Sequence, residues 1–308
     1  MLPKGFTARL PLWRYLVAAR VRQMRSVACL TLFFFALPVI PAAPWSPAVW
    51  GATPPTVQLL DAPAPGATVN YLVRFAWQGA DADGIVTGYR YAIDPPAFGD
   101  PYWIATSATE QSIFFRTSEL QLPIPATGPV TFTQPHTLLL ESIDNDGLMS
   151  DPLSRSFFSS TVAPDVQILS PSPSATGPVA IDDQVTIQWQ GTDADGVFSN
   201  RPVRYKYALF GEFSGLPGGI DGVWSHPDEI RLAYAPEFTN WTDTSSDSTT
   251  VRLTNLILGS RYLFCVVGFD EAGAYSARFA QAVNMVLMRV SATPATRKSW
   301  GGLKARYR

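Results

Sequence analysis

Two stretches of nearly the same sequence decide the fold: Phe75–Gly84 (FAWQGADADG) and Ile187–Gly196 (IQWQGTDADG). In each stretch, large apolar residues occupy every second position up to a tryptophan, and an Asp-x-Asp-Gly cluster follows. Alternation with a period of two predicts a half-buried β-strand, and Asp and Gly favour the turn that ends it. The chain of 308 residues therefore carries one structural unit written twice.

The similarity of the two copies extends in both directions. Each copy opens with Pro-x-Val-Gln, at Pro55 and Pro164, and a Tyr-x-Tyr-Ala run follows the acidic cluster, at Tyr89 and Tyr205. No long segment after the N-terminal region has a helical period, so we predict an all-β protein of two tandem antiparallel β-sandwiches. The last matched positions are Leu138, Leu140, Asp144, Gly147 and Ser150 in the first copy, and Phe264, Val266, Asp270, Gly273 and Ser276 in the second.

These residues resemble the fibronectin type III family of immunoglobulin-like β-sandwiches. The second copy follows the family pattern nearly in full, from Leu253 and Leu256 through Gly259 and Tyr262. The resemblance implies that Tyr262 is a corner tyrosine whose hydroxyl bonds to the preceding backbone. It also implies that Trp77 and Trp189 are buried. The first copy departs from the pattern, because His136 stands at the corner position and extra residues occur around Pro123–Pro135.

The N-terminal region has the features of an export signal. The uncharged apolar run Val27–Ile40 follows Arg20, Arg22 and Arg25, and small residues come after it. A membrane-spanning helix needs about 20 apolar residues, so cleavage, after Ala43 or after Ala48, is favoured over an uncleaved anchor, which stays an alternative. The predicted organisation is a signal at 1–43 (with Met24 as an alternative start), a linker at 44–53, sandwiches at 54–162 and 163–290 with an insertion at 211–240, and a basic tail at 291–308.

Charge is segregated along the chain. Six basic residues and no acids lie in 1–43, and the same holds for 289–308, so the residues between them hold 11 of the 23 basic residues and all 25 acids. A body this acidic excludes nucleic acid as a partner, because phosphate contacts need a basic face. An acidic body is compatible with divalent cations.

Acidic residues gather in the turns that follow the second and sixth strands of each predicted sandwich. These turns lie at the same end of a sandwich, where several carboxylates could supply the oxygen ligands that Ca²⁺ prefers. The alternative is that Asp and Gly serve turn geometry alone, and the spacing of an EF-hand is absent. The candidate calcium ligands are Asp81, Asp83, Asp144, Asp146, Asp193, Asp195 and Asp270, and no other cofactor is expected.

Signatures of catalysis are missing, so we expect no enzymatic activity. The two histidines, His136 and His226, have no supporting nucleophile motif, and neither a Gly-x-Ser-x-Gly elbow nor a phosphate-binding loop occurs. His136 is expected in a strand of the core, and His226 in a solvated loop. Cys265 lies in an apolar strand pattern and is expected to be a buried, inert thiol.

The insertion at 211–240 is the longest difference between the copies. It carries Phe213, Trp224, Tyr234 and Phe238, which could anchor a protein or stack on a polysaccharide, or could pack back onto their own sandwich. The sequence predicts a secreted, periplasmic or cell-surface interaction or spacer protein without catalysis. The alternative is an accessory, non-catalytic portion of a secreted carbohydrate-active or proteolytic enzyme. A membrane contact is expected only through an uncleaved signal.

Overall fold

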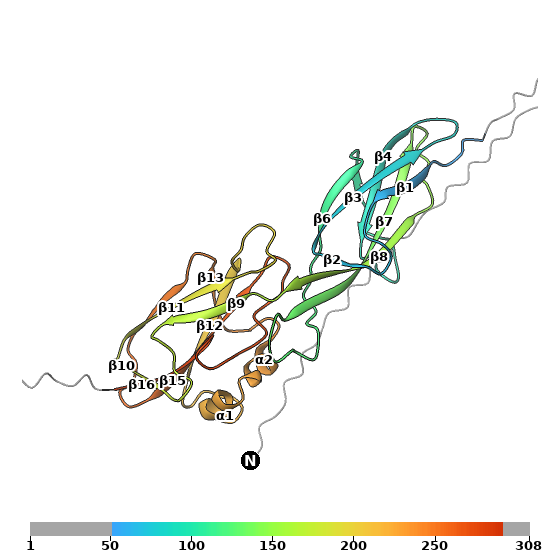
Figure 1. The fold of residues 1–308 in the computed structure, drawn as a ribbon. Coiled ribbons are helices and arrows are strands. Elements are labelled where there is room, and N and C mark those ends of the chain that lie inside the picture. Colours follow the sequence, from blue (N-terminus) through green and yellow to red (C-terminus); the bar gives the residue numbers. More distant parts are fainter. Residues whose placement is uncertain (1–50, 292–308) are drawn as a thin grey trace, which may run out of the picture. The chain divides into compact units, whose positions relative to one another are not determined.

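The structure, a computed structural model, describes residues 51–291 (Figure 1). These residues belong to a single unit of the chain that begins at Gly51. The predicted export signal, most of the linker at 44–53 and the basic tail after Ser291 lie outside the described residues. None of the helices within 51–291 has the length and apolar character needed to cross a membrane.

The first copy forms two sheets, one of three strands and one of five. The order in the small sheet is β1-β3-β6, and the order in the large sheet is β2-β8-β7-β4-β5. Neighbouring strands are antiparallel except for the parallel pair β2 and β8. The strands are β1 (Thr56–Asp61), β2 (Thr68–Asn70), β3 (Leu72–Ala80), β4 (Val86–Ile93), β5 (Ile104–Thr106), β6 (Glu110–Phe114), β7 (Thr131–Asp144) and β8 (Leu153–Val162).

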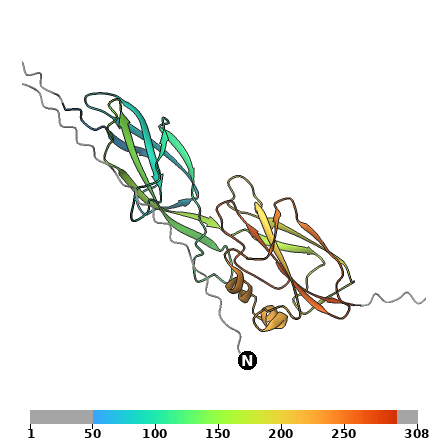
Figure 2. The ribbon, with the colours of Figure 1, turned by 180° about the vertical axis from the view of Figure 1, so that it is seen from behind.

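The second copy repeats this arrangement strand for strand. Its sheets have the orders β14-β11-β9 and β10-β16-β15-β12-β13, again with one parallel pair, β10 and β16. Figure 2 shows both copies from behind. Two tandem β-sandwiches are therefore confirmed. The strands are β9 (Asp165–Ser170), β10 (Val179–Ile181), β11 (Val185–Thr192), β12 (Arg204–Gly211), β13 (Thr242–Ser245), β14 (Thr250–Leu253), β15 (Arg261–Phe269) and β16 (Met285–Val290).

Each sandwich has its own core around the tryptophan of the repeated stretch. Trp77 is 1% exposed and packs against Tyr89 and Tyr91, and Trp189 is 2% exposed and packs against Tyr205. The alternation in β3 and β11 explains this, because every second side chain of a strand points to the same face. The predicted burial of both tryptophans is confirmed.

Cys265 lies on β15 with its side chain fully buried. Burial raises the pKa of its thiol above the ordinary value, so the reactive thiolate is disfavoured. The expected burial of this thiol is confirmed.

The insertion at 211–240 contains two short helices that its sequence pattern did not predict. Helix α1 (Gly219–Ser225) and helix α2 (Asp228–Tyr234) have seven residues each, too few for a period of 3.6 to stand out. Helices this short are held by packing more than by propensity. Ile220, Val223 and Ile230 are accordingly buried in the same apolar cluster as strand β15.

Candidate functional site

The two sandwiches follow each other with almost no linker. Strand β8 ends at Val162 and β9 begins at Asp165, so only Ala163 and Pro164 intervene. Apolar side chains of both sandwiches belong to one buried cluster. In that cluster, the ring of Phe132 from the first sandwich lies 5.0 Å from the ring of Tyr275 in the second. We call this contact region the junction.

The segments in which the two copies differ both contribute to the junction. The extra residues of the first copy come before β7 and lengthen its first half, which places Val130 and Phe132 in the shared cluster. The insertion of the second copy brings Phe238, whose ring lies 5.4 Å from that of Tyr275. The extra residues before β7 and the insertion at 211–240, which distinguish the two copies in sequence, therefore both contribute to the contact between the sandwiches.

The acidic turns of the second sandwich also lie at the junction, where they accept hydrogen bonds from the first sandwich. Asp195 Oδ2 accepts the backbone N–H of Val162 at 3.0 Å, and Asp270 Oδ2 accepts the hydroxyl of Thr161 at 2.8 Å. Glu271 Oε1 accepts the hydroxyl of Tyr71 at 2.8 Å. We call Asp193, Asp195, Asp270 and Glu271 the acidic junction.

Asp193 is the most unusual member of the acidic junction. It is 3% exposed, and no side chain donates a hydrogen bond to its carboxylate. Burial raises its pKa to about 7, with further contributions from the charges of Asp270, Asp195 and Glu271. Only the backbone N–H of Asp195, in the same turn, acts to lower the pKa of Asp193.

The pKa values of Asp270 and Glu271 are also shifted, and in each case burial and hydrogen bonds act in opposite directions. Burial raises the pKa of Asp270 to about 6, although hydrogen bonds from Thr161 and the turn amides oppose it. Burial acts on Glu271 in the same sense. There, hydrogen bonds from backbone amides and from Tyr71 outweigh it and hold the pKa below the usual value.

The matching turns of the first sandwich make the same local contacts in a more open setting. Asp83 accepts the backbone N–H of Thr53 at 3.0 Å, just as Asp195 accepts that of Val162. Thr53 and Val162 each stand three residues before the first strand of their sandwich. In each sandwich, the second Asp of the repeated motif therefore accepts a hydrogen bond from the backbone just before the first strand.

Turn geometry accounts for much of the remaining acidic pattern. Asp144 Oδ1 accepts the backbone N–H groups of Asp146 and Leu148, both at 2.8 Å, as expected for an Asp that closes its own turn. Asp81 Oδ1 accepts the N–H of Asp83 at 3.4 Å, and the side chain of Asp146 is exposed. Within residues 51–291, no group of three or more His, Cys, Asp or Glu side chains stands ready to hold a metal ion. Calcium binding stays a prediction.

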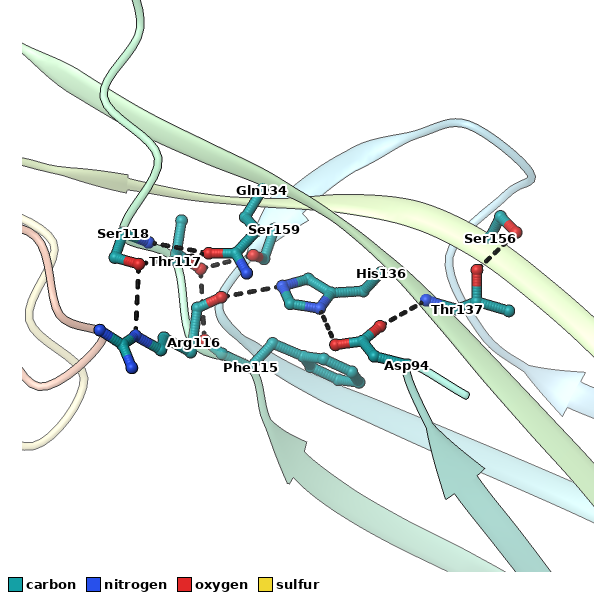
Figure 3. Close-up of polar contacts among 10 residues, drawn as sticks. All are labelled: Asp94, Phe115, Arg116, Thr117, Ser118, Gln134, His136, Thr137, Ser156 and Ser159. Atoms are coloured by element: carbon teal, nitrogen blue, oxygen red, sulfur yellow. Dashed lines mark hydrogen bonds and ion pairs between the residues drawn. The ribbon is translucent and has the colours of Figure 1, made fainter. Parts of the chain in front are cut away.

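The histidine at the corner of the first sandwich has a structural role (Figure 3). His136 is 4% exposed, with Nδ1 2.7 Å from Asp94 Oδ2 and Nε2 2.8 Å from the backbone oxygen of Arg116. In the second sandwich the backbone N–H of Ile257 donates to the hydroxyl oxygen of Tyr262 at 3.1 Å, which confirms the corner tyrosine. His136 replaces it by bonding to the backbone from the same strand position.

The pair of Asp94 and His136 resembles the orienting acid and base of a catalytic triad, but the geometry does not continue to a nucleophile. His136 Nε2 faces the carbonyl oxygen of Arg116, which only accepts hydrogen bonds. The ring therefore donates there and cannot take a proton from a hydroxyl at the same nitrogen. His226 is exposed, as expected, and its Nδ1 lies 3.3 Å from the backbone oxygen of Gly222.

The four aromatic residues of the insertion do not form a common surface. Phe238 is fully buried, and Trp224 and Tyr234 are partly buried against the apolar cluster of the second sandwich. Phe213 is the exception, since its side chain is fully exposed. Of the two alternatives for these residues, packing back onto their own sandwich therefore holds for three of the four, and partner binding through Phe213 stays a prediction.

Sequence reasoning did not find the residues of the first sandwich that face the acidic turns. Tyr71 and Thr161 look like ordinary strand residues, and their role appears only when the two copies are placed together. One signal was available, because the interval between the last strand of the first copy and Pro164 leaves no room for a linker. A short interval predicts contact between neighbouring domains.

Comparisons with known proteins find structural similarity of low degree. No protein-family model and no curated protein matches the chain. Among solved structures, it is similar to the fibronectin(III)-like modules of Clostridium thermocellum CbhA, at 12% identity and a TM-score of 0.28 over 77% of this chain and 94% of that one. A segment of two fibronectin type III domains from chicken tenascin matches at 11% identity and a TM-score of 0.27, over 76% and 98% of the two chains.

The FN1–FN3 domains of chicken CNTN1 match at 15% identity and a TM-score of 0.23, over 77% of this chain and 68% of that one. All these identities and TM-scores are low, so the fold rests on the strand orders and registers described above. The chain is a tandem of two β-sandwiches similar to fibronectin type III modules.

Proposed function

We propose that the protein is a non-catalytic spacer and interaction module that holds its two sandwiches in one arrangement outside the cytoplasm. The observation that carries the proposal is the junction, in which two intervening residues, a shared apolar cluster and several hydrogen bonds connect the sandwiches. A flexible tether would need a longer, polar linker. The buried histidine, whose Nε2 is bonded to a backbone carbonyl, supports the absence of catalysis.

Measurement of backbone ¹⁵N relaxation tests the spacer role. If the sandwiches act as one rigid piece, their amides report the same overall tumbling time, as expected for a body of their combined size. Two shorter, independent tumbling times would contradict the proposal. Export is tested separately by N-terminal sequencing of protein recovered outside the cytoplasm, with a mature start after Ala43 as the expected result.

Interaction is best tested at Phe213, because its side chain is exposed and the rest of the insertion supports the core. A panel of polysaccharides and surface proteins should include a ligand that binds the wild type and binds Phe213→Ala more weakly. Truncating an exposed aromatic anchor typically costs more than about 1 kcal/mol of binding energy. Equal binding by the variant would show that the interaction surface lies elsewhere.

A further inference from the structure

A groove lies beside the junction, between segments of both sandwiches. Its walls are the segment 122–126 that precedes β7, residues 227–231 at the start of helix α2, and Arg278 with Phe279, which together surround a volume of about 760 Å³. We call it the basic groove. Since its walls come from both sandwiches, the groove exists only when the sandwiches are docked.

The basic groove is positively charged, although the body of the protein is acidic. Arg231 and Arg278 both line it, and none of the ion pairs formed within residues 51–291 includes either of them. Asp228 is the acid among the lining residues, so two positive charges lie there with one negative charge. The groove therefore attracts anionic groups that the rest of the surface repels.

The hydrogen bonds of Arg278 go to neutral groups. Its Nη1 donates to the carbonyl oxygen of Gly128 at 3.2 Å, and its Nη2 donates to the carbonyl oxygens of Pro125 and Gly128. Carbonyl oxygens accept hydrogen bonds but carry no net charge, so they do not neutralise the guanidinium. The same bonds hold the segment 125–128 against the second sandwich and fix one wall of the groove.

Arg231 also has a hydrogen-bond donor that is not used. Its Nε is buried and has no hydrogen-bond partner, which is unfavourable for an N–H group. Asp228, three residues earlier in helix α2, is exposed and forms no ion pair with it within the described residues. A guanidinium presents a fork of N–H groups that matches the two oxygens of a carboxylate. A carboxylate in the groove supplies the missing acceptor once the guanidinium turns toward it.

The other walls of the basic groove are mostly apolar. Leu122 is 69% exposed, Ile124 packs against the shared apolar cluster, and Phe279 belongs to that cluster. The exposure of Leu122 shows that the groove is shallow, whereas sites for small molecules enclose most of their ligand. A shallow groove with apolar walls and two arginines fits an extended chain in which acidic and apolar side chains are neighbours.

We propose that the basic groove binds an acidic peptide segment of a partner protein, with a carboxylate on Arg231 and Arg278 and an apolar side chain against Leu122. Charge complementarity of this kind gives an interface its specificity. The ends of this chain do not fit the groove, because each end holds six basic residues and no acid. The groove shares no residue with the exposed Phe213, so the inference goes beyond the interaction proposed there.

Peptide selection on the whole protein tests the proposal. The probe is a pool of capped octapeptides built from Leu, Phe, Pro, Gly, Asp and Glu, and a matched neutral pool has Asn and Gln in place of Asp and Glu. The immobilised protein should retain a set of acidic sequences, read by mass spectrometry, and no comparable set from the neutral pool. Calorimetric titration then gives the affinity of the peptide that is retained best.

Three variants test the role of charge. Arg231→Gln should weaken binding roughly 10–100-fold, the loss expected when a charged hydrogen-bond partner is removed. Asp228→Asn removes the repelling acid and should strengthen binding roughly 2–5-fold, a gain that misfolding cannot produce. Arg252→Gln is the matched control and should leave the affinity unchanged, because Arg252 is exposed on β14, outside the groove, and bonds to the neutral Gln184.

Several results would overturn the proposal: no retained acidic peptide, equal retention from the neutral pool, or an unchanged affinity in Arg231→Gln. A wild type that self-associates in sedimentation and becomes monomeric as Arg231→Gln would make a second copy the occupant, and would overturn the proposal of a partner peptide. Independent tumbling of the sandwiches in the ¹⁵N relaxation measurement would overturn both this proposal and the spacer role. Joint tumbling without peptide binding would overturn this proposal alone.

Discussion

The acidic turns of the two sandwiches have nearly the same sequence but different surroundings. In the first sandwich, Asp81 is half-buried and Asp83 is exposed, and Asp83 fastens Thr53, which lies just before β1. In the second, Asp193 is buried, and Asp195 fastens the end of a strand that belongs to the first sandwich. The motif thus holds the segment before the first strand in both sandwiches. The acids are more buried in the second sandwich because that segment is part of the first sandwich, which covers them.

Glycine in the repeated motif shows how closely these turns are built. A Cβ atom at Gly196 would lie 1.9 Å from the backbone oxygen of Ser199, far inside any real contact. A Cβ at Gly84 would lie 2.2 Å from Asn145 Oδ1. The second copy therefore needs glycine after its second Asp, because the obstructing atom belongs to the backbone, whereas in the first copy the end of the Asn145 side chain can turn away.

The largest loss of stability is expected from truncating the tryptophan at the centre of either core. Replacing Trp189 by Ala should cost about 3–5 kcal/mol of unfolding free energy, because a large buried side chain is removed and a cavity remains. Trp77→Ala should cost a similar amount. Denaturant unfolding followed by circular dichroism measures both values, and an unchanged midpoint in either variant would refute the equivalence of the two cores.

A second prediction compares the contribution to stability of a side chain at the junction with that of the residue at the matching position of the other copy. Phe132 is fully buried against the second sandwich, whereas Leu258, which also stands four residues before its corner residue, is 64% exposed. Phe132→Ala should destabilise the protein by roughly 3–5 kcal/mol, and Leu258→Ala by no more than about 0.5 kcal/mol. Equal effects of the two changes on chemical denaturation would mean that the shared cluster does not hold the sandwiches together.

The corner positions give a smaller, graded contrast. His136→Ala leaves the backbone oxygen of Arg116 without its donor and should cost about 1–3 kcal/mol. Tyr262→Phe removes only an accepted hydrogen bond at a part-exposed site and should cost about 0.5–1.5 kcal/mol. Thermal unfolding of both variants ranks the corners, and a larger loss for Tyr262→Phe would reverse the comparison.

The smallest effect is expected at the tip of the insertion. Phe213→Ala should change the unfolding free energy by no more than about 0.5 kcal/mol, since the side chain is fully exposed. Phe238→Ala, in the same insertion, should cost about 3–5 kcal/mol because its ring fills the core. Calorimetric melting of the pair shows which part of the insertion supports the fold, and a large loss for Phe213→Ala would contradict this division.

Sequence predicted the sandwiches well and the junction poorly, for physical reasons. Alternation around Trp77 and Trp189 reports directly on which face of a strand is buried, so strands and cores follow from it. The partners of the acidic turns do not, because Tyr71 and Thr161 reach Glu271 and Asp270 across a domain boundary. Helices α1 and α2 escaped prediction since packing, rather than a period in the sequence, holds them.

The central claim is that the two sandwiches are docked through the junction. Spin labels at the exposed positions 98 and 213, introduced as Phe98→Cys and Phe213→Cys with Cys29 replaced by Ser, would report the distance between the sandwiches, since Cys265 is buried and will not react. Pulsed electron-spin distance measurement should give one narrow distribution, which Phe132→Ala broadens. A distribution already broad in the unaltered junction would contradict the claim.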